Sequence, residues 1–278
     1  MGGMPVKGTD GLRRAPGACA CVLLVLAALG GCSSGPAARA PAASGTPART
    51  ASPTPSATPA PTPAITTPPV DPAKAPHTRA EAVAVLEKVI ADARLFDTRV
   101  RPATPYESRP GTFPVLDADC LWQTGPLPEG VLAARTRYFR LPARTGGGDV
   151  EITATVTVHG SEAGAGGRLA RSLEDAMRCP DQRLRDDQRL TGLTGVAMYY
   201  GEFGNVVSHD TVNEYGTYTG PDGSPQKYVW VQSRYGPVTM AVSVKNAPGV
   251  DWTTLQEMYA TGHAWMVQRA KIALGKAA

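Results

Sequence analysis

The clearest pattern in the chain is an alternation of apolar and polar residues over residues 150–159. Five aliphatic residues occupy every second position: Val150, Ile152, Ala154, Val156 and Val158. The positions between them are polar: Glu151, Thr153, Thr155, Thr157 and His159. Successive side chains of a strand point to opposite faces. The pattern therefore predicts a half-buried antiparallel strand with one solvated face, on which His159 is an ordinary surface side chain.

Similar patterns predict the remaining strands at residues 131–141, 193–200, 204–218, 227–235 and 238–245. Glycine and proline turns separate several of them, at Gly146-Gly147-Gly148, Pro221-Asp222-Gly223 and Tyr235-Gly236-Pro237. In the last strand, aliphatic side chains again alternate with smaller or polar ones. We expect most of these strands to pair with an antiparallel neighbour.

Three segments have the spacing and the start signals of helices. Thr78 with Glu81 forms a capping box for a helix through Leu95, Ser161 can cap a helix that ends before Cys179, and Asp251 can cap a helix to about Leu274. The apolar faces of the first two are Val83, Leu86, Val89, Ile90 and Ala93, and then Leu169, Leu173, Ala176 and Met177. The third offers Leu255, Met258, Tyr259, Met266, Ala270 and Ile272.

Two segments are predicted to be irregular. Residues 98–119 contain Pro102, Pro105, Pro110 and Pro114, and residues 181–189 are dense in charge and read as a solvated connection. Strands are grouped and flanked by helices, without strict alternation between the two. This order predicts an α+β fold, a mostly antiparallel β-sheet flanked by helices in a single globular domain.

The N-terminus has the layout of a bacterial lipoprotein signal. Lys7, Arg13 and Arg14 precede an apolar stretch of roughly a dozen residues, short of the ~20 that a membrane-spanning helix needs. Leu29-Gly30-Gly31-Cys32 then resembles a lipobox. The resemblance implies that residues 1–31 are removed and that Cys32 carries a diacylglycerol, which anchors the protein at the outer face of the cell membrane. An ordinary signal peptide with a coincidental cysteine is the alternative.

Residues 32–77 are predicted to be a disordered tether. They are almost wholly Ala, Pro, Thr, Ser and Gly, and proline recurs every second to fourth residue between Pro53 and Pro63. Proline removes backbone donors, and a segment with so little aliphatic bulk cannot offset the entropy of ordering. Its Ser, Thr and Pro content is also compatible with O-linked sugars. The folded domain is therefore assigned to residues 78–278.

Composition and cysteine content limit the partners and the redox state. The formal charge of +4 falls to +2 once three basic residues and one acidic residue leave with the signal, so nucleic acid is not an expected partner. Cys120 and Cys179 remain besides Cys32, and two cysteines of an exported domain most simply form a disulfide worth about 4 kcal/mol. Two buried free thiols or an intermolecular bond are the alternatives. No ligand spacing for a metal is present, and no cofactor is expected.

The sequence contains one weak candidate for a catalytic motif. Ser208, His209 and Asp210 are the residue types of a hydrolytic triad, but neighbours on a strand point to opposite faces and cannot relay a proton. We expect no enzyme. Aromatic residues gather in the strand region and serve either the core or a binding surface: Tyr199, Tyr200, Tyr215, Tyr218, Tyr228, Trp230 and Tyr235. At least one of Tyr199 and Tyr200 should point outward.

The domain resembles the PknH-like extracellular sensor domains of actinobacterial lipoproteins and kinases. The matching features are the leading helix, Cys120, the strand at 150–158 followed by a helix and Cys179, and the closing strand and helix. The second cysteine pair usual near the last strands of that type is missing here. The resemblance implies a central antiparallel sheet with packed helices, and a cleft for an unidentified envelope ligand. A non-enzymatic sensor or ligand-binding lipoprotein is thus the first hypothesis, an accessory lipoprotein acting by protein–protein contact the second, and an envelope hydrolase the third.

Overall fold

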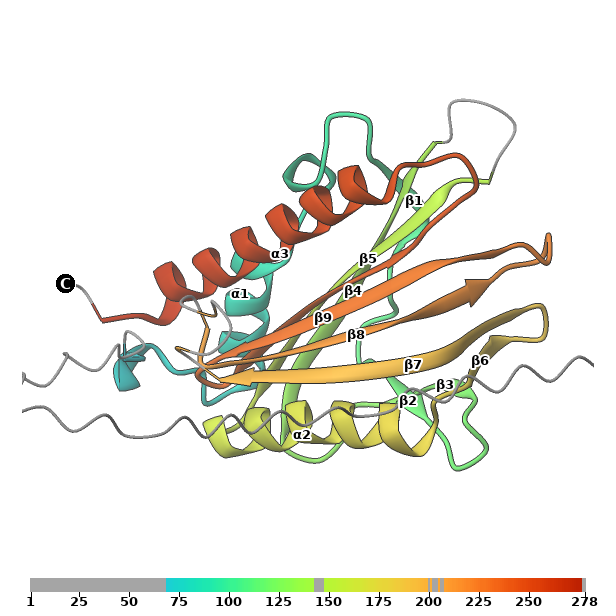
Figure 1. Cartoon of the computed structure of the whole chain (residues 1–278). Coiled ribbons are helices and arrows are strands. Elements are labelled where there is room, and N and C mark those ends of the chain that lie inside the picture. Colours follow the sequence, from blue (N-terminus) through green and yellow to red (C-terminus); the bar gives the residue numbers. More distant parts are fainter. Residues whose placement is uncertain (1–68, 143–147, 200, 202–204, 206–207, 277–278) are drawn as a thin grey trace, which may run out of the picture. The chain divides into compact units, whose positions relative to one another are not determined.

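The computed structural model describes residues 69–142, 148–199, 201, 205 and 208–276, all within the unit Ala60–Ala278. The predicted signal, Cys32, nearly all of the tether, Tyr200 and most of the turn at 146–148 lie outside the described residues. Three α-helices surround an eight-stranded sheet (Figure 1). The helices are α1 (Arg79–Val89), α2 (Glu162–Arg178) and α3 (Trp252–Leu274). The predicted α+β class is confirmed.

Every neighbouring pair in the sheet is antiparallel, in the order β1-β4-β5-β10-β9-β8-β7-β6. The strands are β1 (Arg101–Glu107), β4 (Val131–Leu141), β5 (Val150–His159), β6 (Gln182–Arg185), β7 (Gln188–Tyr199), β8 (Asp210–Thr219), β9 (Pro225–Tyr235) and β10 (Val238–Lys245). A separate hairpin consists of β2 (Thr112–Leu116) and β3 (Trp122–Pro126). β10 inserts beside β5, so the closing strand completes the centre of the sheet.

The main core lies between one face of the sheet and helices α1 and α3. The aliphatic side chains of β5 and β10 that share this face are all fully buried, as the alternation predicts. Leu86 of α1 and Leu255 and Met266 of α3 pack into the same core. Burial of apolar area of this kind is the main stabilising term of a fold. The two helices and the sheet thus form one continuous core.

Side-chain caps begin the three helices where the sequence predicts. Thr78 and Glu81 make the reciprocal capping box, Ser161 accepts from the N–H of Gly164, and Asp251 accepts from that of Thr254. The prediction for the end of α1 is wrong: the helix stops at Val89, and Asp92 caps a separate 3₁₀ turn at Ala93–Leu95. Within the described residues, no helix is both long and apolar enough to cross a membrane.

Both segments predicted to be irregular contain strands. Residues 98–119 include β1 and β2, and residues 181–189 include β6 and the start of β7. β1 tolerates Pro102 because it is the edge of the sheet and its ladder is irregular between Pro102 and Glu107. β6 is the opposite edge, where charged side chains stay in solvent while the backbone pairs with β7.

Helix α2 lies on the face of the sheet opposite to α1 and α3 (Figure 1). It covers the ends of β5 and β10 and the middle of β7–β9, so the second face of β5 is only partly solvated. His159 is therefore buried, not on the surface as predicted, and its Nε2 lies 3.3 Å from Thr239 Oγ1. Three residues assigned to apolar helix faces are exposed instead, Val83 on α1, Met177 on α2 and Ile272 on α3.

Candidate functional site

The face of the sheet that α2 leaves uncovered is the floor of an open trough with a volume of about 2010 Å³. We call this cavity the trough: its floor is β4, β5, β10, β9 and the end of β8, and the β2–β3 hairpin lies along one side. The loops at Pro221–Asp222 and Asn246–Gly249 line the far end. Pockets for small ligands measure roughly 300–1,000 Å³, so this cavity is larger than one small molecule requires.

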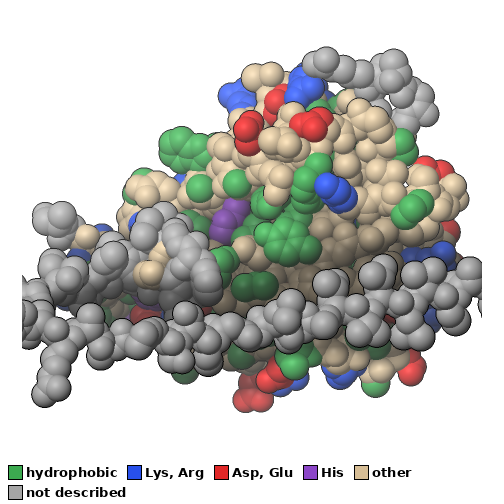
Figure 2. Space-filling view, viewed as in Figure 1, with side chains coloured by type: hydrophobic (Ala, Val, Ile, Leu, Met, Phe, Trp, Pro, Cys, Tyr) green, Lys and Arg blue, Asp and Glu red, His purple; other side chains and the backbone are tan. Residues whose placement is uncertain are grey.

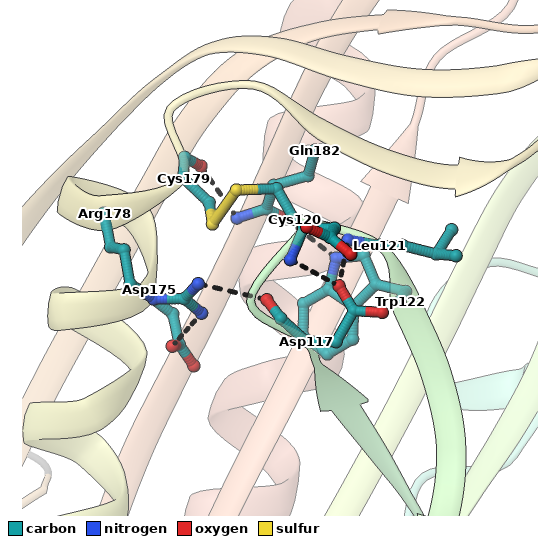
Figure 3. The surroundings of a disulfide bond; sticks show 9 residues. Asp117, Cys120, Leu121, Trp122, Asp175, Arg178, Cys179 and Gln182 are labelled. Atoms are coloured by element: carbon teal, nitrogen blue, oxygen red, sulfur yellow. Dashed lines mark hydrogen bonds and ion pairs between the residues drawn. A yellow bond between two sulfur atoms is a disulfide. The ribbon is translucent and has the colours of Figure 1, made fainter.

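A disulfide holds the hairpin beside the sheet. Cys120 lies in the turn between β2 and β3, Cys179 is the C-cap residue of α2, and their Cα atoms are 5.6 Å apart (Figure 3). The expected bond between the two cysteines is thus present. Within the fold it links α2, which covers one end of the sheet, to the hairpin that borders the trough.

Hydrogen bonds around the disulfide fix the same turn. Arg178 Nη1 donates to the carbonyl of Asp117, and the Cys120 carbonyl accepts from the N–H of Arg183 (Figure 3 shows the first). Trp122 Nε1 donates to Gln182 Oε1 at 2.7 Å. The Trp122 ring, which lines the trough, is therefore oriented by β6, the edge strand next to it.

The register of the sheet aligns the floor residues in rows. Partners across antiparallel strands share a face. One row consists of Tyr138, Thr153, Ser243, Trp230 and Glu214, from β4 to β8. The next row lies closer to the Asn246–Gly249 loop and contains Arg140, Glu151, Lys245 and Tyr228. Side chains from strands that are far apart in the sequence thereby become neighbours.

The side of the trough formed by β9, the end of β8 and the adjoining β6 and β7 is apolar and aromatic. Leu190, Tyr218 and Tyr228 form a small buried cluster with Leu193, against which Leu184 and Trp230 pack. Except for Leu193, all of these residues line the trough. This cluster is separate from the main core on the other face of the sheet. Trp230, which is only partly buried, gives this half of the trough an accessible ring surface, and the buried tyrosines support it.

The part of the floor over β4, β5 and β10 carries hydroxyl groups. Thr153 and Ser243 have their oxygens 2.7 Å apart, and those of Thr136 and Thr155 are 2.8 Å apart. A hydroxyl offers one donor and two acceptor positions, so each pair keeps acceptor positions for a ligand. The hydroxyl half and the aromatic half meet where Ser243 neighbours Trp230.

Opposite charges are balanced in the trough. Five basic residues line it, Arg109, Arg135, Arg140, Arg185 and Lys245, and four acidic ones, Glu107, Asp149, Glu151 and Asp222. Lys245 Nζ lies 2.9 Å from Glu151 Oε2 and 5.0 Å from the centre of the Tyr218 ring. Arg140 and Arg135 are paired in the same way, with Asp149 and Glu107. The trough therefore lacks a field of one sign.

A buried carboxyl group lies in the central row, beneath α2. Burial raises the pKa of Glu214 to about 7, the Asp175 carboxylate of α2 acts in the same direction, and a hydrogen bond from Tyr228 opposes them. Burial also raises the pKa of Tyr228 well above its usual value. Because Glu214 is nearly enclosed, it supports the floor and does not present a carboxylate to the trough.

Ser208, His209 and Asp210, the weak triad candidate that the sequence argued against, bind different partners. Ser208 is fully buried and its Oγ lies 3.0 Å from Asn205 Oδ1 and 2.8 Å from Thr211 Oγ1. His209 Nδ1 accepts from the N–H of Gly236, and Asp210 accepts from Arg234 Nε at 2.6 Å. These three residues are not among the residues that line the trough. The described residues include no group of three or more His, Cys, Asp and Glu placed to hold a metal ion.

The aromatic residues divide between the two roles left open by the sequence. Tyr218, Tyr228 and Trp230 line the trough, whereas Tyr235 belongs to the main core. Tyr199 is 60% exposed, so one member of the Tyr199–Tyr200 pair does point outward. The hydroxyl half of the trough was not predicted. Its signal was the run of threonines at alternate positions of β5, facing Ser243 of β10.

Comparisons with known proteins add one structural likeness. No family model matches the chain, and no curated protein matches it. Among solved structures, the chain is similar to the extracellular domain of PknH from Mycobacterium tuberculosis, with a TM-score of 0.41 and 11% identical residues. The alignment covers 71% of this chain and 98% of that one. A likeness of this strength assigns neither a family nor an activity, so the resemblance seen in the sequence stays a prediction.

Proposed function

We propose that the chain is a non-enzymatic ligand-binding module of the sensor type, which works on the outer face of a bacterial cell membrane. The observation that carries the proposal is the trough, an open cavity of about 2010 Å³ on the polar face of the sheet. Concave surfaces that combine apolar rings with a few oriented polar groups are the usual form of ligand sites. The candidate nucleophile Ser208 is buried away from it, which favours binding over catalysis.

The proposed anchor is a lipid on Cys32, followed by the tether. The folded part shows where the tether would join the domain. The carbonyl of Pro69 accepts from Tyr235 Oη beside the β9–β10 turn, whereas Lys245 and Tyr228 lie at the other end of the same two strands. The attachment point therefore leaves the trough unobstructed.

A second candidate function is an accessory lipoprotein that acts by contact with another protein. Three exposed side chains favour it: Val196 on β7, Tyr215 on β8 and Trp265 on α3. Figure 2 shows hydrophobic side chains gathered beside α3 on the face turned toward the viewer. Exposed apolar patches of several hundred Å² mark protein contacts.

Photo-crosslinking in intact cells distinguishes the two functions. A photoreactive amino acid replaces Thr124, an exposed residue lining the trough, or Val196 on the other face, or Ile272 as an exposed control on α3. An adduct at Thr124 that is missing at Ile272 supports the ligand-binding function. An adduct with one protein at Val196 and none at Thr124 overturns it in favour of the accessory function.

The anchor is tested separately by mass spectrometry of the protein purified from the membrane. We expect an N-terminal Cys32 carrying two or three acyl chains, and a Cys32→Ala variant that is released from the membrane fraction. An unmodified N-terminus at another residue would contradict the lipoprotein assignment and leave the trough hypothesis intact.

A further inference from the structure

We infer that the trough binds an uncharged glycan chain of the cell envelope, with the sugar rings lying on the Trp230 side and their hydroxyl groups on the Thr153–Ser243 side. The inference rests on the proposed ligand-binding function and names the chemical class of its ligand. It is carried by the division of one continuous floor into an aromatic half and a hydroxyl half.

The two halves match the two sides of a sugar ring. A pyranose has apolar C–H faces and a polar rim of hydroxyls. Trp230 of β9 is partly exposed and offers a ring surface for the apolar faces, and it packs against the buried cluster that contains Tyr228 of the adjacent row. The hydroxyls of Ser243 and Thr153 lie across the next two strands and can bond the rim. Both halves come from rigid strands, so little ordering is needed on binding.

The dimensions indicate several sugar units, not one. The floor spans five adjacent strands from β4 to β8, and strands lie about 4.8 Å apart, so the floor is about 19 Å wide. The volume of about 2010 Å³ exceeds that of sites for single small molecules. A short chain of sugars fills such a space, and an isolated monosaccharide leaves most of it to water.

The charge balance indicates that the chain is neutral. The two cations in the floor rows are both paired, Lys245 with Glu151 at 2.9 Å and Arg140 with Asp149 at 3.5 Å, and the Tyr218 ring also covers Lys245. Arg109 and Arg185 are exposed and come from separate loops and strands. A phosphate or nucleic-acid site needs several unpaired cations that converge on one point.

The backbone of the floor disfavours an extended peptide. Each of β4, β5, β10, β9 and β8 pairs on both sides, so their N–H and C=O groups are already bonded within the sheet. A peptide could not extend the ladder there, as it does when it adds to an open edge.

An acyl chain is disfavoured because it would remove Thr153, Ser243 and the Lys245–Glu151 pair from water without replacing their bonds.

Two matched pairs of variants test the inference on the full processed chain. Trp230→Ala removes a ring from the trough, and Trp265→Ala removes a half-exposed ring from α3. Thr153→Val removes a hydroxyl from the floor and leaves a side chain of nearly the same shape. Thr194→Val makes the same change at an exposed position of β7 outside the trough, as the control. The probes are neutral oligosaccharides of two, four and six hexose or N-acetylhexosamine units, a phosphorylated hexasaccharide and a peptide with the sequence of residues 53–63.

We expect binding by titration calorimetry to tighten from two to six units and to be insensitive to salt. Trp230→Ala and Thr153→Val should each weaken the hexasaccharide about tenfold or more, while Trp265→Ala and Thr194→Val leave it unchanged. Circular dichroism and thermal unfolding of each variant verify that it is folded. Thr153→Val retains the shape of the strand, so it keeps the test valid if Trp230→Ala does not fold.

Three results would overturn the inference. They are binding of the phosphorylated probe alone with strong salt dependence, binding of the peptide in preference to every sugar, or no binding of any sugar. In each case an adduct at Thr124 in cells would keep the ligand-binding function and reject only the glycan. Absence of any adduct at Thr124 would reject both.

Discussion

Glu214 and Tyr228 share a buried hydrogen bond beneath α2, on the adjacent strands β8 and β9. Glu214 lies in the same row of the trough floor as Trp230, and Tyr228 lies in the same row as Lys245. Their hydrogen bond therefore connects two neighbouring rows of the floor. Burial raises the pKa of Glu214 from its ordinary value of 4.5 to about 7, with Asp175 adding to the effect. The Glu214 carboxyl therefore exchanges its proton around neutral pH while the protein is folded.

The raised pKa of Glu214 predicts a pH-dependent stability. The folded chain holds the proton up to about pH 7, whereas the unfolded chain releases it near 4.5. The stabilisation is therefore complete below 4.5 and is lost as the pH rises through 7, by on the order of 3 kcal/mol in total. Glu214→Gln should remove this dependence. Urea unfolding of both proteins at pH 5 and pH 8 measures the difference.

The comparison must be made against the wild type at each pH, because two histidines act in the opposite direction. Burial lowers the pKa of His159 and of His263 to about 4, so their stabilisation is present at neutral pH and is lost as the pH falls. Glu174→Gln, an exposed change on α2, is the matched control. Equal pH profiles for Glu214→Gln and the wild type would contradict the assignment.

The disulfide should contribute strongly to stability. Cys120 and Cys179 are separated by 59 residues, and closing such a loop lowers the entropy of the unfolded chain by an amount worth about 4 kcal/mol. We expect the Cys120→Ser/Cys179→Ser double variant to lose this amount in urea unfolding. The same loss should occur when the wild type is reduced, and the double variant should not respond to reductant. A wild type that is equally stable with and without reductant would refute the prediction.

Two helical glycines should respond in opposite ways to the same substitution. A Cβ on Gly262 of α3 would overlap Phe96 Cε1, and the Phe96 ring is buried against Phe139, so a shift of the ring would disturb the packing of the core. Gly262→Ala should cost about 1–3 kcal/mol despite the better helix propensity of alanine. A Cβ on Gly167 of α2 meets nothing within 4 Å.

Gly167→Ala should therefore stabilise the protein by about 0.5–1 kcal/mol, since only the helix propensity changes. Thermal unfolding of the two variants, run side by side with the wild type, provides the test. A stabilised Gly262→Ala variant would show that α3 and Phe96 pack less closely than the structure has them.

Phe139 should be among the most sensitive core positions. Its ring is 1% exposed, with ring centres 5.2 Å from Phe96 and 5.7 Å from Tyr106. Phe139→Ala leaves a cavity among these rings and should cost about 3–5 kcal/mol. Ile272→Ala, at a position 71% exposed, should change the stability by less than about 0.5 kcal/mol. Comparable losses in chemical unfolding at the two positions would contradict the core assignment.

Local patterns were sufficient to predict the strands at 131–141, 150–159 and 238–245 and the starts of all three helices. Each of these signals lies within one short stretch: an alternation of period two, or a capping residue followed by an apolar face. β1, β2 and β6 lay in segments predicted to be irregular, and in β1 and β6 the reason is that their own residues are poor strand formers. β1 contains prolines and β6 charges, and both are strands because β4 and β7 offer them an edge.

Long-range packing decided the features that bear most on function. His159 was predicted to be on the surface because β5 alternates correctly, but α2 packs over that end of the strand. Likewise, Met177 and Ile272 follow the helical period yet lie at positions that no other element covers. A periodic pattern indicates which side chains share a face, and it does not indicate how far a neighbouring element extends.

The sequence by itself determined the fold class, which residues of the central strands share a face, the helix caps and the two cysteines available for a bond. Only the tertiary structure decided that β10 lies beside β5 and β9, which aligns Thr153, Ser243 and Trp230 in one row. Alternation is set by the backbone geometry of a single strand, whereas a row across a sheet depends on which strands pair and in which register. The trough therefore exists only in the folded chain.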